Sequence, residues 1–292
     1  MGANFWPGVE RAAMSKYPGP ISPTSTPTIG GLYAEQFLPS GTPRGVVVIT
    51  HGYAEHCGRY RELAHVIVEA GWAALSYDVR GHGQSPGVRG YIDKFDAYLE
   101  DLQQIVRAAR ALVAKDAPLV LLGHSHGSLI TLRALTDERP IDCKAAIVSS
   151  PYLGLKLAVP GYKKVLARIG SVVAPKLAQP NSLQVDQLTS DKQKQDERLA
   201  DKLCFDIATA RWFTESSAAQ DYVFANASRI KVPTTWLVGG ADPIADPARS
   251  KAVAAKVPGA KYHDLVGLKH EVFNETTRDE VFAEVTKVLA SA

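Results

Sequence analysis

Apolar positions along the chain form short continuous runs, and these alternate with stretches in which apolar residues recur every three or four positions. The runs 46–50, 72–77 and 119–122 are typical of strands that are buried on both faces. The stretches 59–70 and 95–113 place their apolar residues on one helical stripe. This alternation predicts an α/β fold, with a mostly parallel, doubly wound sheet of about eight strands covered by helices.

The alternation stops between residues 152 and 226, where the pattern predicts several helices and no strand. Strand patterns return at 234–238 and 262–266, so the intervening segment is interpreted as a helical cap inserted into one sheet domain. Proline, glycine and serine dominate the start of the chain and favour an extended arm there. The expected organisation is an arm (1–28), a first core part (29–151), the cap (152–226) and a second core part (227–292).

Composition excludes several classes of protein. Apolar residues make up 46% and charged residues 22%, which is ordinary for a globular domain. The net charge of +3 is small and the basic residues are dispersed, so no nucleic-acid partner is expected. No apolar stretch reaches the roughly 18 residues of a spanning helix, and no secretion signal is evident, which favours a cytoplasmic location. Cys57, Cys143 and Cys204 are widely separated and are expected to be reduced thiols.

Candidate chemistry centres on the sequence G-H-S-H-G at residues 123–127, which joins an apolar strand pattern to a helical one. Glycines on both sides of Ser125 allow a sharp turn that lifts the hydroxyl out of the chain, so Ser125 is the candidate nucleophile. A serine that merely caps the helix is the alternative. A serine nucleophile also needs a histidine base and an acid that orients it.

Asp242 and His270 meet that need, because each follows a strand and the order Ser, Asp, His is that of the α/β-hydrolase fold. Asp78 is expected to fix its own glycine-rich loop, and Asp246 to begin a helix. The backbone N–H groups of His126 and Tyr53 are the expected oxyanion donors. His124 and His126 lack a third ligand at suitable spacing, so neither a metal nor a cofactor is expected.

Five segments resemble the monoacylglycerol lipase and lysophospholipase branch of the α/β hydrolases, a serine aminopeptidase-like family; they are residues 51–60, 78–85, 123–127, 239–246 and 263–275. The resemblance implies a serine esterase that acts on monoacylglycerols, with the same catalytic and oxyanion residues. The family usually has a small residue where Tyr53 or Ala54 stands, a methionine or glutamine where His126 stands, and a second glycine where Ser128 stands. These differences affect the shape of the pocket and the acyl preference. A lysophospholipase, a short-chain carboxylesterase and a non-catalytic binding protein on the same fold are the alternatives.

The cap is expected to contact the substrate, through Leu153, Tyr162, Val165 and Ile169. No acidic residue lies between Asp142 and Asp186, while basic residues are frequent there; they include Lys163, Lys164, Arg168 and Lys176. A basic, apolar helix of this kind can lie at a lipid surface, which would make the protein a peripheral membrane protein. Alternatively, the apolar stripe packs down on the sheet and the lysines are simply solvated.

Overall fold

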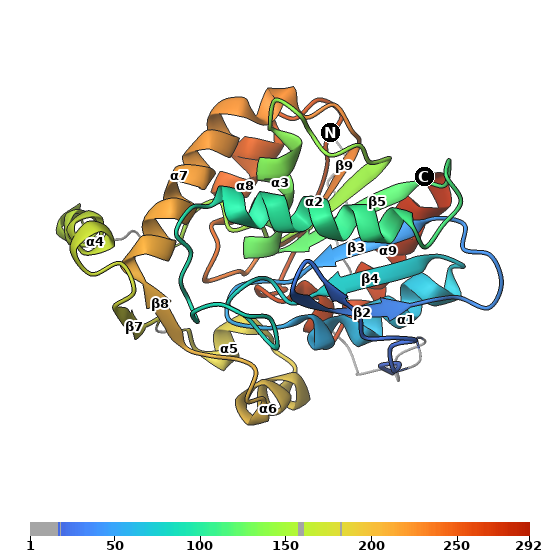
Figure 1. Ribbon diagram of the computed structural model, residues 1–292, viewed down its shortest axis with the longest axis horizontal. Helices are drawn as coiled ribbons and strands as arrows, with labels where there is room; N and C mark the ends of the chain where they lie inside the picture. Colours follow the sequence, from blue (N-terminus) through green and yellow to red (C-terminus); the bar gives the residue numbers. More distant parts are fainter. Residues whose placement is uncertain (1–16, 18, 157–160, 182) are drawn as a thin grey trace.

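An eight-stranded sheet forms the centre of the molecule (Figure 1). The computed structural model describes residue 17 and residues 19–156, 161–181 and 183–292. The strands lie in the order β1-β2-β4-β3-β5-β6-β9-β10, with β1 and β2 antiparallel to their neighbours and the others parallel. Their bounds are β1 Thr28–Ile29, β2 Leu32–Phe37, β3 Val46–Thr50, β4 Ala73–Tyr77, β5 Leu119–His124, β6 Ala145–Ser149, β9 Thr234–Gly239 and β10 Lys261–Leu265. The predicted fold class is confirmed.

Helices cover both faces of the sheet, and β3 shows why. Val46 and Val48 join the apolar cluster that contains α2 and α3, whereas Val47 and Ile49 join the cluster that contains α1 and α9. Alternate side chains of a strand point to opposite faces, so a continuous apolar run needs a cover on each side. The core helices are α1 Arg61–Glu69, α2 Asp96–Arg110, α3 His126–Leu135, α8 Pro247–Ala254 and α9 Arg278–Ser291, with short 3₁₀ turns η1 Cys57–Tyr60, η2 Ala227–Arg229 and η3 Val272–Asn274.

The described end of the predicted arm packs on the core. The Tyr17 ring meets the Phe282 ring of α9 edge-on, with centroids 5.6 Å apart. Ser25 pairs with Gln36 in an isolated bridge, and β1 then extends the sheet beyond β2. Most of the predicted arm, residues 1–16 and 18, lies outside the described residues.

Residues 152–226, called the cap from here on, contain four helices among the described residues (Figure 1). The expectation of no strand in this segment was wrong, since β7 and β8 pair antiparallel. Each has three residues, too few for an alternating pattern to be recognised in the sequence. The cap elements are α4 Gly161–Val173, β7 Ala178–Pro180, α5 Val185–Leu188, α6 Lys192–Ala200, β8 Ile207–Thr209 and α7 Ala210–Asn226. Over the described residues, no helix combines the length and apolarity needed to cross a membrane.

Candidate active site

Ser125 lies at the turn between β5 and α3 and has an unusual backbone conformation, with φ 51° and ψ −112°. The two flanking glycines are required by close packing. A Cβ on Gly123 would lie 2.6 Å from the carbonyl oxygen of Gly127, and one on Gly127 would collide with the carbonyl oxygen of Thr50. The turn can therefore be this tight only with glycine on both sides, and it exposes the serine hydroxyl at the end of the strand.

His270 and Asp242 are hydrogen-bonded in series behind Ser125. His270 Nε2 lies 2.8 Å from Ser125 Oγ, and His270 Nδ1 lies 2.7 Å from Asp242 Oδ2. The other oxygen of Asp242 accepts the backbone N–H groups of Ile244 and Ala245, at 2.8 and 3.0 Å. These bonds fix the carboxylate plane. The three residues meet because β5, β9 and β10 are parallel, so the loops after them lie at the same edge of the sheet.

The surroundings of His270 favour its protonated form. Burial alone would lower the pKa of the imidazole, but the Asp242 carboxylate and the hydrogen bond to it outweigh burial, and the pKa is raised above its usual value. Because an ionised carboxylate can only accept, Nδ1 carries the proton that points at Asp242. Nε2 is then free to accept a proton from Ser125.

The other acids and histidines weighed from the sequence have structural roles. Asp78 accepts the backbone N–H groups of Cys57 and Gln84, at 2.8 and 2.6 Å, and so fixes the two loops that meet there. Asp246 caps the first turn of α8. His124 is buried and its Nδ1 lies 3.1 Å from Ser149 Oγ. These positions agree with the selection of Asp242 and His270 as partners of Ser125.

His126 and Tyr53 lie close to Ser125. His126 is the first residue of α3, where a backbone N–H has no acceptor within its own helix. Tyr53 follows β3, the strand that pairs with β5, and it lines the same cavity as Ser125. Both side chains pack against Trp212 of α7, with ring centroids 3.7 Å apart for Tyr53 and 5.3 Å for His126. The cap thus contacts both residues through one aromatic ring.

A cavity of about 540 Å³ leads from Ser125 to the outer surface of the cap. Its inner end is polar and contains His124, Glu55 and Arg198. The rest of its wall is mostly apolar and comes largely from α4 and α7; these helices contribute Tyr162, Leu166, Ala167, Gly170, Trp212 and Phe213. Such a cavity suits a ligand with a long apolar part and a small polar end.

Of the four cap residues expected to contact substrate, Tyr162 lines the cavity and the other three are not among its described lining residues. Leu153 is buried in the core below the cap. Val165 and Ile169 are 54% and 55% exposed on the outer side of α4. The structure thus does not place these three at the cavity. For Val165 and Ile169 the reason is that α4 is apolar on two sides, and periodicity alone does not distinguish the side that faces the cavity from the side that faces solvent.

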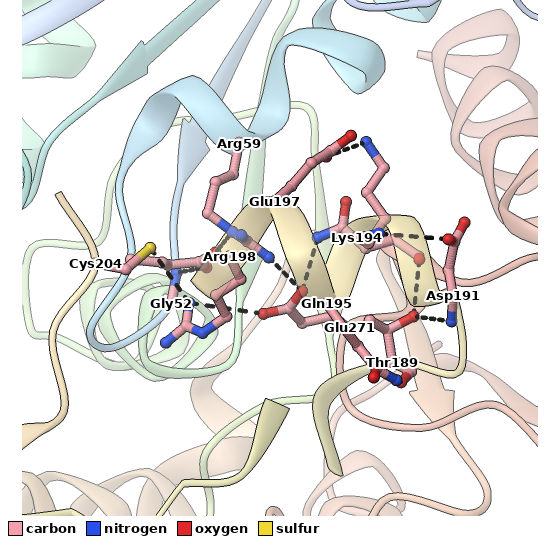
Figure 2. Close-up of polar contacts among 12 residues, drawn as sticks. Gly52, Arg59, Thr189, Asp191, Lys194, Gln195, Glu197, Arg198, Cys204 and Glu271 are labelled. Atoms are coloured by element: carbon pink, nitrogen blue, oxygen red, sulfur yellow. Dashed lines mark hydrogen bonds and ion pairs between the residues drawn. The ribbon is translucent and has the colours of Figure 1, made fainter. Parts of the chain in front are cut away.

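A buried cluster of charges near Ser125 was not predicted from the sequence. Arg59 lies 3.0 Å from Glu55 and 2.6 Å from Glu271, the residue after His270 (Figure 2). Burial alone would raise the pKa of Glu55, but Arg59 and nearby cations lower it, so this carboxylate is charged. Burial lowers the pKa of His124 to about 4, which keeps it neutral near pH 7. In the sequence, Glu55 and Arg59 stand four residues apart within the segment 51–60. This spacing could have indicated the ion pair, but neither residue was given a role.

The described residues contain one group of three potential metal ligands, namely His56, Asp201 and Cys204, whose ligand atoms lie within 4.8 Å of one another. The N–H of Gly58 donates to His56 Nδ1, so the proton of the neutral ring is on Nε2, 2.6 Å from Asp201 Oδ2. Burial raises the pKa of the Cys204 thiol to about 12. Metal ligands must be deprotonated, so these hydrogen bonds and this burial do not fit a metal site.

The strand order and the Ser–His–Asp series at the carboxyl edge of the sheet make this protein an α/β-hydrolase. Sequence comparison agrees with this class. Residues 41–277 match the model of the hydrolase family described as serine aminopeptidase, S33. The chain belongs to that family, and the resemblance inferred from its motifs is confirmed.

Similar proteins match nearly end to end. A monoacylglycerol lipase of Mycolicibacterium smegmatis is 30% identical over 276 residues, which cover 90% of this chain and 95% of that protein. Phospholipase YtpA of Bacillus subtilis is 29% identical over 82% of this chain and 93% of its own length. The crystal structure of the Paleococcus ferrophilus monoacylglycerol lipase has a TM-score of 0.80 at 28% identity, covering 89% and 98% of the two chains.

Proposed function

We propose that this enzyme hydrolyses carboxylic esters of lipids, with monoacylglycerols as its main substrates. The observation that carries the proposal is the hydrogen-bonded series of Ser125, His270 and Asp242 at the inner end of a largely apolar cavity. Similarity over nearly the whole chain to proteins named monoacylglycerol lipase supports the same substrate class. An acyl chain would lie along the apolar wall, with the alcohol at the polar end.

The reaction begins with attack of Ser125 Oγ on the ester carbonyl carbon while His270 Nε2 takes the serine proton. The carbonyl oxygen becomes an oxyanion, which the N–H groups of Tyr53 and His126 stabilise. Asp242 holds the ring in the required tautomer and stabilises the imidazolium. The Nε2 proton then passes to the alcohol oxygen as the ester C–O bond breaks, which leaves an acyl group on Ser125.

Water completes the cycle from the same geometry. His270, neutral again, takes a proton from a water molecule as its oxygen attacks the acyl carbon. The second oxyanion occupies the same two N–H groups. When it collapses, the bond to Ser125 Oγ breaks, the proton on His270 returns to the serine, and a fatty acid leaves. Neither step requires a metal or a cofactor.

A lysophospholipase is the second candidate, since one relative is named a phospholipase. The leaving alcohol of a lysophospholipid carries a phosphate, whereas glycerol is uncharged. Glu55, Glu271 and Arg198 line the cavity, and Arg59 pairs with both glutamates from outside its described lining, so the polar end has no excess of positive charge. This balance favours a neutral glycerol over a phosphate-bearing headgroup. Relative kcat/KM on a monoacylglycerol and a lysophosphatidylglycerol of equal acyl length tests the choice, because the second releases an alcohol with a net negative charge. Preference for the lysolipid would replace the proposed substrate.

The exposed residues of α4 provide a surface for peripheral membrane contact. Seven large apolar residues on α4 and just after it are at least half exposed and are called the α4 patch; they are Tyr162, Val165, Leu166, Ile169, Val172, Val173 and Leu177. Arg168 and Lys176 beside them are also exposed, while the side chains of Lys163 and Lys164 lie outside the described part. Tyr162, Leu166 and Leu177 also line the cavity, so a lipid can pass from the patch towards Ser125.

A fluorophosphonate probe provides the first test of the proposed function, because it reacts with an activated serine. Labelling of the protein, and loss of labelling in Ser125→Ala, is the expected result. Release of fatty acid from dispersed monoacylglycerols should be lost in the same variant. Full labelling of Ser125→Ala, or undiminished fatty acid release, would overturn the assignment of the nucleophile.

A further inference from the structure

The loop that supplies one of the proposed oxyanion donors has a conformation that needs support from outside. This segment, Gly52–His56, is called the oxyanion loop. Within it the Gly52 N–H donates to Glu55 Oε1 at 2.6 Å, which closes the loop on itself. Ala54 has φ 61°, in the left-handed region that residues with a Cβ adopt only where their surroundings hold them. Tyr53, whose N–H is the proposed donor, directly precedes it.

The support comes from the cap. The Ala54 carbonyl accepts two hydrogen bonds, from Arg198 Nη2 and from the Phe205 backbone N–H, both at 3.2 Å. The hydroxyl of Tyr53 donates to the carbonyl of Ile207 at 2.7 Å. These three partners lie within ten residues of one another at and after the end of α6. The oxyanion loop is therefore held on the cap side at two consecutive residues.

Arg198 is firmly placed for this contact. Its side chain is 9% exposed, and its Nη1 lies 4.0 Å from Glu271 Oε1 (Figure 2). Its Nη2 donates to the Ala54 carbonyl, so the guanidinium joins Ala54 and Glu271. A guanidinium presents several donors in a rigid plane and can engage a carbonyl and a carboxylate together. A buried charge without such partners is strongly disfavoured, so Arg198 has little freedom to move away.

The helix that carries Arg198 is itself anchored to the core. Asp191 caps the start of α6 by accepting the N–H groups of Gln193 and Lys194. The same carboxylate lies 3.0 Å from Arg278 of α9, and Lys194 Nζ lies 3.1 Å from Glu62 of α1. Arg198 therefore projects from a helix whose position is set by two core helices.

We propose that Arg198 is a positioning residue, which holds the Ala54 carbonyl and thereby the Tyr53 N–H where the oxyanion develops. The inference rests on the proposed function, because it assumes that Tyr53 donates to the transition state. Arg198 acts through the backbone and need not touch the substrate. A misplaced donor weakens transition-state binding more than substrate binding, so kcat changes and KM does not.

The test compares Arg198→Gln and Arg198→Lys with a matched control, Arg211→Gln. Arg211 is another cap arginine that pairs with the core, at 3.3 Å from Asp93, but it contacts neither the oxyanion loop nor the cavity among the described residues. The measurements are kcat and KM on p-nitrophenyl butyrate, the inhibition constant of an alkyl trifluoromethyl ketone, and the melting temperature. The hemiketal oxygen of the ketone requires the oxyanion donors.

Both Arg198 variants should lose about 10-fold to 100-fold in kcat, with KM and the control variant changed by no more than about twofold. The inhibition constant of the ketone should rise by the same factor as kcat falls. Arg198→Lys keeps a cation opposite Glu271, so it carries the test if the glutamine variant does not fold. An unchanged kcat in the folded variants, or a raised KM at unchanged kcat, would refute the positioning role. If Ser125→Ala retains full turnover, the proposed function itself fails, whatever Arg198 does.

Discussion

Serine substitutions in the α4 patch should weaken binding to lipid while leaving hydrolysis of a dissolved ester unchanged. The best positions are Ile169, Val172 and Val173, which are 55%, 77% and 78% exposed. None of the three is among the described residues that line the cavity, so the path to Ser125 stays intact. Because these side chains are already in water, their removal costs the folded state little.

The exposed fractions set the size of the effect. Complete burial of a valine or isoleucine side chain is worth about 1.5–3 kcal/mol. These three side chains are between one half and four fifths exposed, and an interface covers only part of that area, so each contributes about 1 kcal/mol on insertion. The triple variant therefore loses about 3 kcal/mol, which corresponds to about a 10²-fold weaker partition onto lipid.

Sedimentation with phosphatidylcholine vesicles measures this partition with little contribution from charge. The matched control carries serine at three exposed apolar positions outside α4, namely Val88, Leu199 and Val266, which are 46%, 69% and 63% exposed. The control should bind vesicles within about twofold of the parent enzyme, and both triples should hydrolyse p-nitrophenyl butyrate normally. Equal vesicle binding by the patch variant and the control would show that α4 is not the membrane surface.

Three further predictions concern the chemistry. Ser125→Ala and His270→Ala should each lower kcat by about 10³-fold to 10⁶-fold, because the three residues act as a unit; turnover near the parent value in either purified variant would contradict this. Asp242→Asn should lower kcat by the same factor or less, because the imidazole loses its orientation. The two backbone hydrogen bonds at this residue should keep the loop folded, and circular dichroism checks this. In a pH profile, kcat/KM should rise as His270 loses its proton, with a midpoint above the usual value of about 6.5 because the pKa of His270 is raised. If the residual activity of Asp242→Asn shows the same midpoint, Asp242 does not raise the pKa of His270.

Much of the core and the Ser–His–Asp series could be predicted because local sequence determines them. Ser125, Asp242 and His270 each follow a strand, and parallel strands bring their ends to one edge whatever the loops do. Gly123 and Gly127 are required by contacts within the same turn. The order of these signals along the chain was therefore enough to indicate their meeting point.

The charge cluster and the cavity wall could not be predicted in this way. Arg198 meets Glu271 and Ala54 only because the cap folds back over the sheet, and nothing near Arg198 in the sequence indicates that contact. The orientation of α4 has the same origin. Its apolar residues cover two sides, so only tertiary packing decides that Tyr162 lines the cavity while Ile169 faces outward.

The position of β9 in the sheet has a consequence for how the chain is made. β9 pairs with β6 in the register Ala146↔Thr234, and the whole cap lies between these two strands in the sequence. Until β9 leaves the ribosome, the edge of β6 is unpaired, and closing so long a loop is a slow step. Asp242 and His270 follow β9 in the chain, so a nascent chain that already contains Ser125 still lacks its two hydrogen-bonded partners. During synthesis the chain is therefore inactive and prone to edge-to-edge aggregation for a time. This stage ends only when β9 and β10 dock on the sheet.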